Sequence, residues 1–191
     1  MSVMVTPEMF VAGYMRELRK KTESDWIQMK TTSRTIFTKE AAQTVIREAG
    51  PRLDSVLIPS KEYFRVDIIG EEKVGDKDCN WMLRVAFEHE NDLRYYNGRP
   101  AWIQELCKLT HLFADLRVLA AYHNSEKDRD LEQLLQRNVD RMQSIESRMT
   151  RVPNGQWLFI FGPNSRSING FRSFKLGGNN GTTMTELEIS A

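Results

Sequence analysis

Two stretches of the chain alternate between hydrophobic and polar residues, which is the pattern of neighbouring β-strands. The first stretch covers residues 63–69 (YFRVDII) and the second covers residues 81–89 (WMLRVAFEH). One face of the second stretch is formed by four apolar side chains: Trp81, Leu83, Val85 and Phe87. The alternation predicts a β-hairpin at the centre of the fold.

Residues 75–78 (GDKD) form the natural turn between these two strands. A turn there predicts Ala86 opposite Asp67 and Arg65 opposite Glu88. Asp67 and Glu88 are then diagonal neighbours on one face, with backbone positions about 7–8 Å apart. We therefore expect the two carboxylates to converge.

Helical periodicity and helix-start signals predict four helices around the hairpin. They cover residues 7–21, 38–49, 100–115 and 126–149. Thr6 and Pro7 begin the first helix, and Thr38 caps the second. Residues 22–37 are expected to be irregular. The buried stripe of the third helix is expected to contain Trp102, Leu106, Leu109 and Phe113.

Short apolar runs outside the hairpin predict further strands. They cover residues 55–58, 117–123 and 156–162, and residues 171–176 and 183–189 form a C-terminal β-hairpin. A strand, a helix and another strand in succession predict a crossover onto one sheet. The predicted fold class is therefore α/β (α+β), with a mixed central sheet flanked by helices.

Composition adds few constraints to this picture. The chain has 191 residues, is 40% hydrophobic and carries a net charge of +1, which fits one domain over residues 1–191. Cys79 and Cys107 do not make a disulfide framework. The sequence has no apolar run of about 20 residues and no secretory signal, so we expect a cytoplasmic protein with no membrane partner.

The motifs of several enzyme classes are absent from the sequence. It has no phosphate-binding loop, no G-x-S-x-G elbow and no C-x-x-C pair. His89 and Glu90 begin like a zinc-protease motif, but the second histidine would have to stand at Leu93. Among the enzyme chemistries considered, binding of a hard metal ion and acid–base catalysis by carboxylates remain.

Asp67, Glu88 and Glu90 crowd one face of the predicted hairpin, and like charges at this spacing repel. One interpretation is an exposed face on which Arg65 pairs with Glu88. The other is a bound cation. The order of the predicted elements favours the bound cation over the exposed face.

Helix, strand, hairpin, helix and strand, from residue 38 to residue 123, resemble the αβββαβ core of the PD-(D/E)xK nuclease superfamily. Asp67, within RVDII, matches the acid on the second strand of that family. Glu88-His89-Glu90 matches the (D/E)-x-K position. The lysine is replaced by Glu90, as in BamHI-like restriction endonucleases.

The resemblance implies that Asp67, Glu88 and the main-chain carbonyl of His89 bind Mg²⁺ or Mn²⁺, and that the protein cleaves DNA. Glu90 would act on the attacking water, and Lys108 would replace the missing lysine. Glu48 would reach the site from the preceding helix. The alternative is a nuclease-fold protein that has lost its chemistry and only binds nucleic acid or protein.

Two predictions concern partners. Arg166, Arg172 and Lys175 alternate with aromatic residues near the C-terminus, which is typical of nucleic-acid contacts. The competing interpretation is an ordinary hairpin whose lysine and arginine side chains lie on its solvent-exposed face. The long helix of residues 126–149 is expected to face the core and also to serve a homodimer, whereas an unrelated interaction protein would use it for assembly alone.

Overall fold

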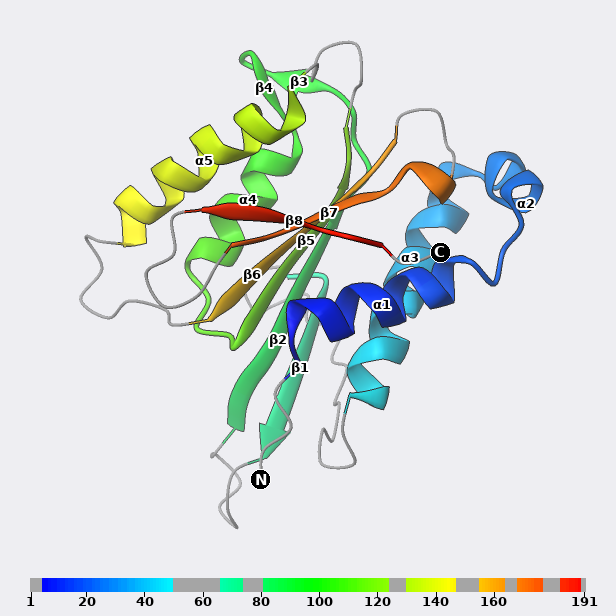
Figure 1. Cartoon of the computed structure of the whole chain (residues 1–191), viewed down its shortest axis with the longest axis horizontal. Coiled ribbons are helices and arrows are strands. Elements are labelled where there is room, and N and C mark those ends of the chain that lie inside the picture. The colour runs from blue at the N-terminus through cyan, green and yellow to red at the C-terminus, as the bar shows by residue number, and fades with distance from the viewer. Residues whose placement is uncertain are drawn as a thin grey trace.

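A six-stranded mixed sheet runs through the molecule, with helices on both of its faces (Figure 1). This computed structural model describes residues 5–49, 66–73, 81–123, 130–146, 155–163, 168–176 and 183–189. The predicted α/β class with a mixed sheet flanked by helices is confirmed. The assignment of the whole chain to one domain stays a prediction.

The order of strands in the sheet is β1-β2-β5-β6-β7-β8. Their bounds are Ile68–Lys73 (β1), Trp81–Glu90 (β2), Leu116–Tyr122 (β5), Gln156–Gly162 (β6), Arg172–Leu176 (β7) and Met184–Leu187 (β8). Strands β2, β5 and β6 are parallel, and the other neighbouring pairs are antiparallel. A separate small hairpin is formed by β3 (Tyr95–Tyr96) and β4 (Arg99–Pro100).

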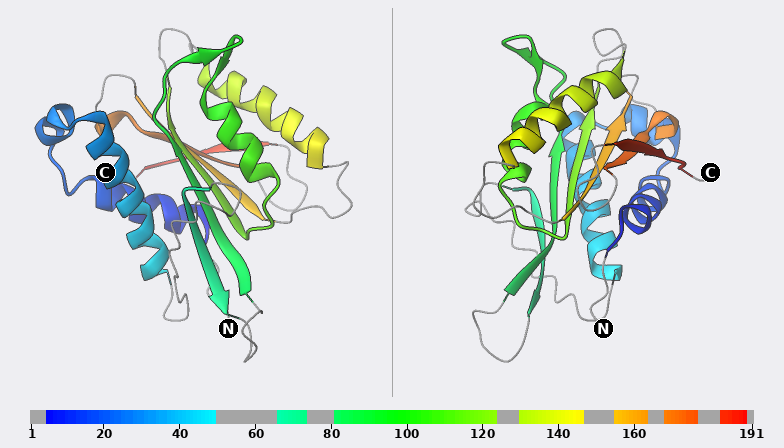
Figure 2. Two further views of the ribbon diagram at one scale, coloured as in Figure 1. Left: turned by 180° about the vertical axis from the view of Figure 1, so that it is seen from behind. Right: turned by 60° about the vertical axis from the view of Figure 1, so that its left-hand side comes forward.

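Strands β5 and β6 lie at the centre of the sheet and are buried on both faces, as expected where helices cover both sides, and Arg117 of β5 is the charged exception among their mostly apolar residues. Helices α1 (Pro7–Leu18) and α3 (Thr31–Glu48) cover one face. Helices α4 (Trp102–Thr110) and α5 (Leu131–Glu146) cover the other (Figure 2). No helix within the described ranges is long and apolar enough to cross a membrane.

The start of α1 agrees with the sequence. The Thr6 side chain accepts a hydrogen bond from the Met9 N–H, and Pro7 stands in the first turn. The predicted strand at residues 117–123, the strand at 156–162 and the C-terminal hairpin are also confirmed. The expected strand at residues 55–58 and the turn at residues 75–78 lie outside the described residues.

The prediction that residues 22–37 are irregular is wrong. A reciprocal capping box between Thr22 and Asp25 begins α2 (Glu23–Gln28), and α3 begins at Thr31. Thr38 is therefore a buried residue inside α3 and not a cap. Its hydroxyl donates to the carbonyl of Arg34 at 3.0 Å, which lets a threonine sit within a helix.

The predicted register of the central hairpin is also wrong. Ile69 pairs with Ala86 and Ile68 pairs with Phe87, so Asp67 lies beside Glu88 and not beside Ala86. The alternation in β2 breaks at a β-bulge. Gly70 pairs with Val85 but Glu71 pairs with Leu83, which leaves Arg84 as the extra residue.

The bulge turns Leu83 toward the α4 face, whereas Val85 packs against the α1 and α3 face. The extra residue is held by two acids. The Arg84 guanidinium donates to Glu72 and to Asp115, each at 2.6 Å. The expectation that Leu83 and Val85 share a face fails for this reason.

The predicted stripe of the third helix needs correction, whereas the described part of the 126–149 helix faces the core as expected and its role in a homodimer stays a prediction. Phe113 is 50% exposed, because α4 ends at Thr110 and does not carry its stripe so far. In the part of the 126–149 helix that the structure describes, the stripe is buried within the chain, apart from Ile145, which is 40% exposed. At 18 residues, α3 is longer than the 16 described residues of α5.

Candidate carboxylate site

Asp67 stands at the entry to β1, where the hairpin register brings it beside Glu88 near the end of β2. Its Oδ2 accepts the main-chain N–H of His89 at 2.9 Å. Its Oδ1 lies 2.6 Å from the Nζ of Lys39, which reaches over from α3. The carboxylate is therefore fixed by both the neighbouring strand and the covering helix.

Glu88 is the most deeply buried acid of the site, with only 2% of the residue exposed. Burial raises its pKa to about 9, and the charges of Asp67 and Glu105 add to the effect. Lys108 opposes it from 3.3 Å away. The predicted convergence of Asp67 and Glu88 thus holds, although it comes from a different register.

Glu105 and Lys108 both come from α4, one turn apart, and they form an ion pair. Burial disfavours the charge on Lys108, but Glu105 and Glu88 together raise its pKa. Because Lys108 is shared between the two acids, it does not fully neutralise Glu88. Glu105 was not among the predicted site residues, yet its spacing from Lys108 was the available signal.

Glu90 lies two residues beyond Glu88 and is partly buried. Burial raises its pKa, and the charge of Glu105 adds to the rise. Its Oε1 accepts the N–H of Asp92 at 2.7 Å. We use the name carboxylate cluster for Asp67, Glu88, Glu90 and Glu105 together with Lys39 and Lys108.

Lys39 was also missing from the predicted site. The sequence prediction began the second helix at Thr38, which made Lys39 an ordinary first-turn residue. In the structure, α3 begins seven residues earlier, and Lys39 lies on its inner side against Asp67. The cluster therefore has one lysine from each face of the sheet.

The His89 side chain lies on the opposite face of β2 from Glu88. Its ring packs edge-on against Tyr122 at 5.7 Å. Burial lowers its pKa to about 4. The structure connects His89 to Asp67 through its main-chain N–H, and metal binding by the His89 carbonyl stays a prediction.

Glu48 is not brought to the cluster. It lies at the last turn of α3, about 13 Å along the helix from Lys39 at 1.5 Å per residue, and it pairs with Arg16 of α1 on the surface.

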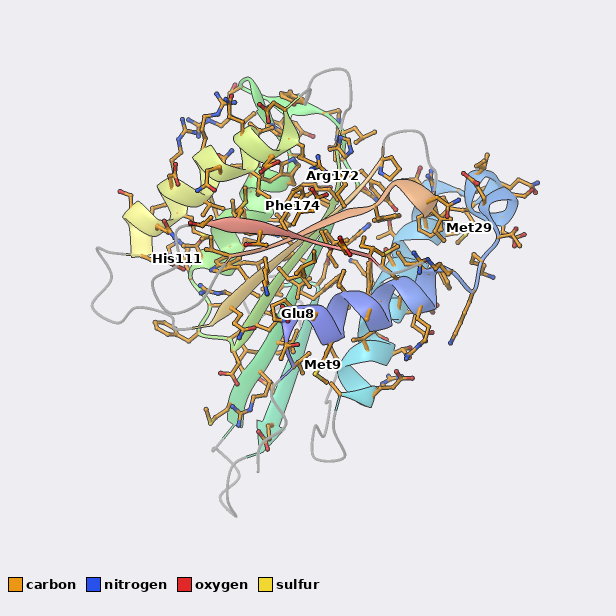
Figure 3. The ribbon with its side chains drawn as sticks, in the orientation of Figure 1. Glu8, Met9, Met29, His111, Arg172 and Phe174 are labelled. Carbon is orange, nitrogen blue, oxygen red and sulfur yellow. The ribbon has the colours of Figure 1, made fainter. Side chains whose placement is uncertain are left out.

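The predicted nucleic-acid contacts lie on the C-terminal hairpin, and each described one is engaged by an acid. Arg172 donates twice to Glu186, at 2.7 and 2.9 Å, and its guanidinium lies over the Phe174 ring (Figure 3). Lys175 pairs with Glu8 at 2.5 Å. Arg166 lies outside the described residues.

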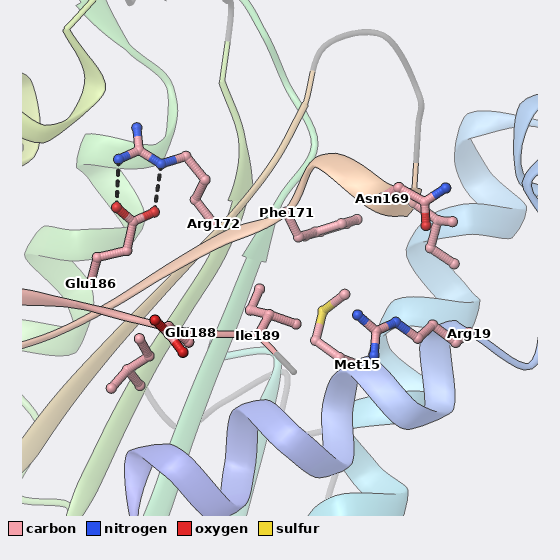
Figure 4. A pocket seen from close by; sticks show the side chains of 10 residues that line it. Met15, Arg19, Asn169, Phe171, Arg172, Glu186, Glu188 and Ile189 are labelled. Carbon is pink, nitrogen blue, oxygen red and sulfur yellow. Dashed lines mark hydrogen bonds and ion pairs between the residues drawn. The ribbon is translucent and has the colours of Figure 1, made fainter. Parts of the chain in front are cut away.

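The Arg172–Glu186 pair forms one wall of a pocket of about 470 Å³ between α1 and the C-terminal hairpin (Figure 4). Met15 and Arg19 of α1 form the facing wall. No residue of the carboxylate cluster lines this pocket. It is a separate feature of the surface.

The donor set of the cluster agrees with the chemistry of magnesium. Mg²⁺ is commonly bound by one or two carboxylates, with waters and substrate phosphate as its other ligands. Asp67 and Glu88 supply such a pair of oxygen donors. Over the described ranges, no group of three or more His, Cys, Asp or Glu side chains is placed to hold a metal ion, so a complete protein cage is not formed there.

Comparison of the chain with models of protein families, with curated proteins and with solved structures finds no match in any of the three.

Proposed function

We propose that this protein is a Mg²⁺-dependent endonuclease that hydrolyses phosphodiester bonds in DNA, with Mn²⁺ able to replace Mg²⁺. Within the α/β class, we assign its fold to a restriction-endonuclease-like αβββαβ core. The observation that carries the proposal is the position of Glu88, nearly fully buried, beside Asp67 at the end of the central hairpin. A buried acid among other acids is unfavourable unless a proton or a cation neutralises it.

Asp67 and Glu88 would hold the ion through carboxylate oxygens, together with the main-chain carbonyl of His89. When bound, the ion polarises the scissile phosphate and lowers the pKa of a bound water. Lys108, whose charge is maintained by Glu105 and Glu88, stabilises the negative charge that grows on the phosphate during attack.

Glu90 takes the proton from the attacking water. Its raised pKa makes it a stronger base than an ordinary surface glutamate. Its Oε1 is held by the Asp92 N–H, which fixes the direction of the carboxylate. Glu90 thus acts on the water, whereas Lys108 supplies the ammonium group of the lysine that the family motif has at the Glu90 position.

A homodimer belongs to this proposal, because cutting both strands of a duplex takes two active sites. The described α5 stripe is largely used inside the chain, so the dimer surface has to be sought elsewhere. Contacts of Arg172 and Lys175 with DNA stay a prediction, and they require the ion pairs with Glu186 and Glu8 to open.

A second candidate function is a protein that binds nucleic acid or another protein on the same fold without catalysis. The observation that favours it is that lysines already contact the two central acids. Lys39 lies 2.6 Å from Asp67, and Lys108 lies 3.3 Å from Glu88. In such a protein the lysines replace the metal.

Cleavage of supercoiled plasmid distinguishes the two candidates. The wild type should convert it to nicked and linear forms with Mg²⁺ and not with EDTA. Asp67→Asn and Glu88→Gln should lose this activity, and Glu90→Gln should lower it about 10²-fold or more. Glu40→Gln, an exposed acid on α3 next to Lys39, is the matched control and should cleave like the wild type. Absence of cleavage with either metal would favour the second candidate.

A further inference from the structure

The β3–β4 hairpin lies next to the carboxylate cluster in the chain and projects into solvent. It follows directly after β2 and leads into α4, so it joins the strand that carries Glu88 to the helix that carries Lys108. The N–H of Ala101 donates to the carbonyl of Arg94 at 3.1 Å and closes its base. The hairpin stands at the top of the molecule in Figure 1, away from the far end of β1 and β2.

The turn of this hairpin is tight and well defined. Asn97 and Gly98 form a two-residue loop with positive φ values of 52° and 75°. This is the Asn-Gly turn that matches the twist of antiparallel strands. Tyr96 and Arg99 are therefore a directly paired couple at the tip.

Two arginines and one aromatic ring share a face of the hairpin. Arg99 is opposite Tyr96 in the hairpin, so these two side chains project to one side, and Arg94, which directly precedes β3, reaches the same side. The Arg94 guanidinium lies over the Tyr96 ring, 5.4 Å from its centre. The Tyr96 residue nevertheless remains 42% exposed.

Asp92 holds this arrangement in place. It accepts hydrogen bonds from the Arg94 side chain at 2.6–2.9 Å and from the Tyr96 hydroxyl at 2.7 Å. Its own N–H donates to Glu90. A chain of contacts thus runs from the candidate base to the exposed ring. Arg99 is exposed and forms no ion pair with any described acid.

We propose that the β3–β4 hairpin binds an unpaired segment of a nucleic-acid strand next to the carboxylate cluster, with a base stacked on Tyr96 and a phosphate on Arg99. This choice of partner rests on the proposed nuclease function. The chemistry is an aromatic platform flanked by cations, which suits bases and phosphates of any sequence. A stacked base needs an accessible face, so unpaired strand is preferred over intact duplex.

The test is binding of the full chain to labelled oligothymidylate in EDTA, followed by fluorescence anisotropy. Binding to oligouridylate and to a duplex of mixed sequence is measured in the same way. The comparison with oligouridylate distinguishes DNA from RNA as the source of the strand. Tyr96→Ala should weaken binding about tenfold, within the range for loss of one stacked base. Tyr96→Phe keeps the ring and should bind like the wild type.

Arg99→Ala should weaken binding and lower the salt dependence by about one counterion. Phe113→Ala removes another exposed aromatic, 50% exposed and beyond the far end of α4, and should change nothing. Because no divalent ion is present, failure of cleavage leaves this result intact. The inference is overturned if the wild type does not bind single strands, if duplex is preferred, or if Tyr96→Ala binds as tightly as the wild type.

Discussion

Two groups of charged residues at the central sheet, one beneath α5 and one next to α4 and α3, differ in their balance of charge. Beneath α5, Arg117 pairs with Glu146 at 2.7 Å, donates to the carbonyl of Gly155 at 3.2 Å and lies over the Trp157 ring at 4.1 Å. This group has one cation for one anion. The carboxylate cluster next to α4 and α3 has four acids for two lysines.

The difference separates an ion pair with matched charges from a cluster in which the acids outnumber the lysines. Arg117 donates to Glu146 and to the Gly155 carbonyl, so its charge has a partner of opposite sign within the chain, although burial still lowers its pKa. Glu88 is left with a pKa raised to about 9, because Lys108 is shared with Glu105. Perturbed acids of this kind are common at functional sites.

The largest effect on stability is expected when the ion pair between Arg117 and Glu146 is broken. Arg117→Ala leaves Glu146 buried without its partner and should lower the free energy of unfolding by about 3–5 kcal/mol. Urea denaturation measures it. Arg141→Ala, an exposed arginine on the same helix as Glu146, is the control and should change stability by less than about 0.5 kcal/mol. A loss below about 1 kcal/mol for Arg117→Ala would contradict the structural role.

The next effect is the pH dependence of stability at the acid-rich cluster. Unfolded Glu88 loses its proton near its ordinary pKa of 4.5, whereas folded Glu88 keeps it up to about 9. The folded state binds more protons in this window, so stability falls as pH rises, by at most about 1.4 kcal/mol per pH unit.

Glu88→Gln removes this titration. The difference in unfolding free energy between Glu88→Gln and the wild type should therefore move in favour of the variant as pH rises through the window. Glu40→Gln should run parallel to the wild type. A pH-independent difference for Glu88→Gln would contradict the raised pKa of Glu88.

The sequence predicted the buried central strand β6 better than the register of the hairpin that carries the carboxylate cluster. Strand β6 was predicted at its observed bounds, because a buried central strand is apolar throughout. Asp67, Glu88, Glu90 and Lys108 were all identified. The register was wrong by two residues. The extra residue at Arg84, which an alternating pattern cannot show, accounts for one of them, and the other was already present on the turn side of the bulge.

Other features depend on tertiary contacts that the sequence does not display. Lys39 reaches Asp67 because α3 begins at Thr31, and a run of threonines is a weak helix signal. The hairpin turn at Tyr96-Asn97-Gly98-Arg99 was not predicted, although its Asn-Gly pair is a sequence signal for such a turn.

The central claim is that the excess of acid at the cluster is there to hold a divalent cation. Thermal melting with and without Mg²⁺, at a pH near the raised pKa of Glu88, tests it most directly. At tenfold excess over its dissociation constant, Mg²⁺ should stabilise the wild type by about 1.4 kcal/mol, a rise in Tm of about 3–6 °C. Glu88→Gln and Asp67→Asn should lose the rise, and Glu40→Gln should keep it. An unchanged Tm for the wild type, or an equal rise for wild type and Glu88→Gln, would contradict the claim.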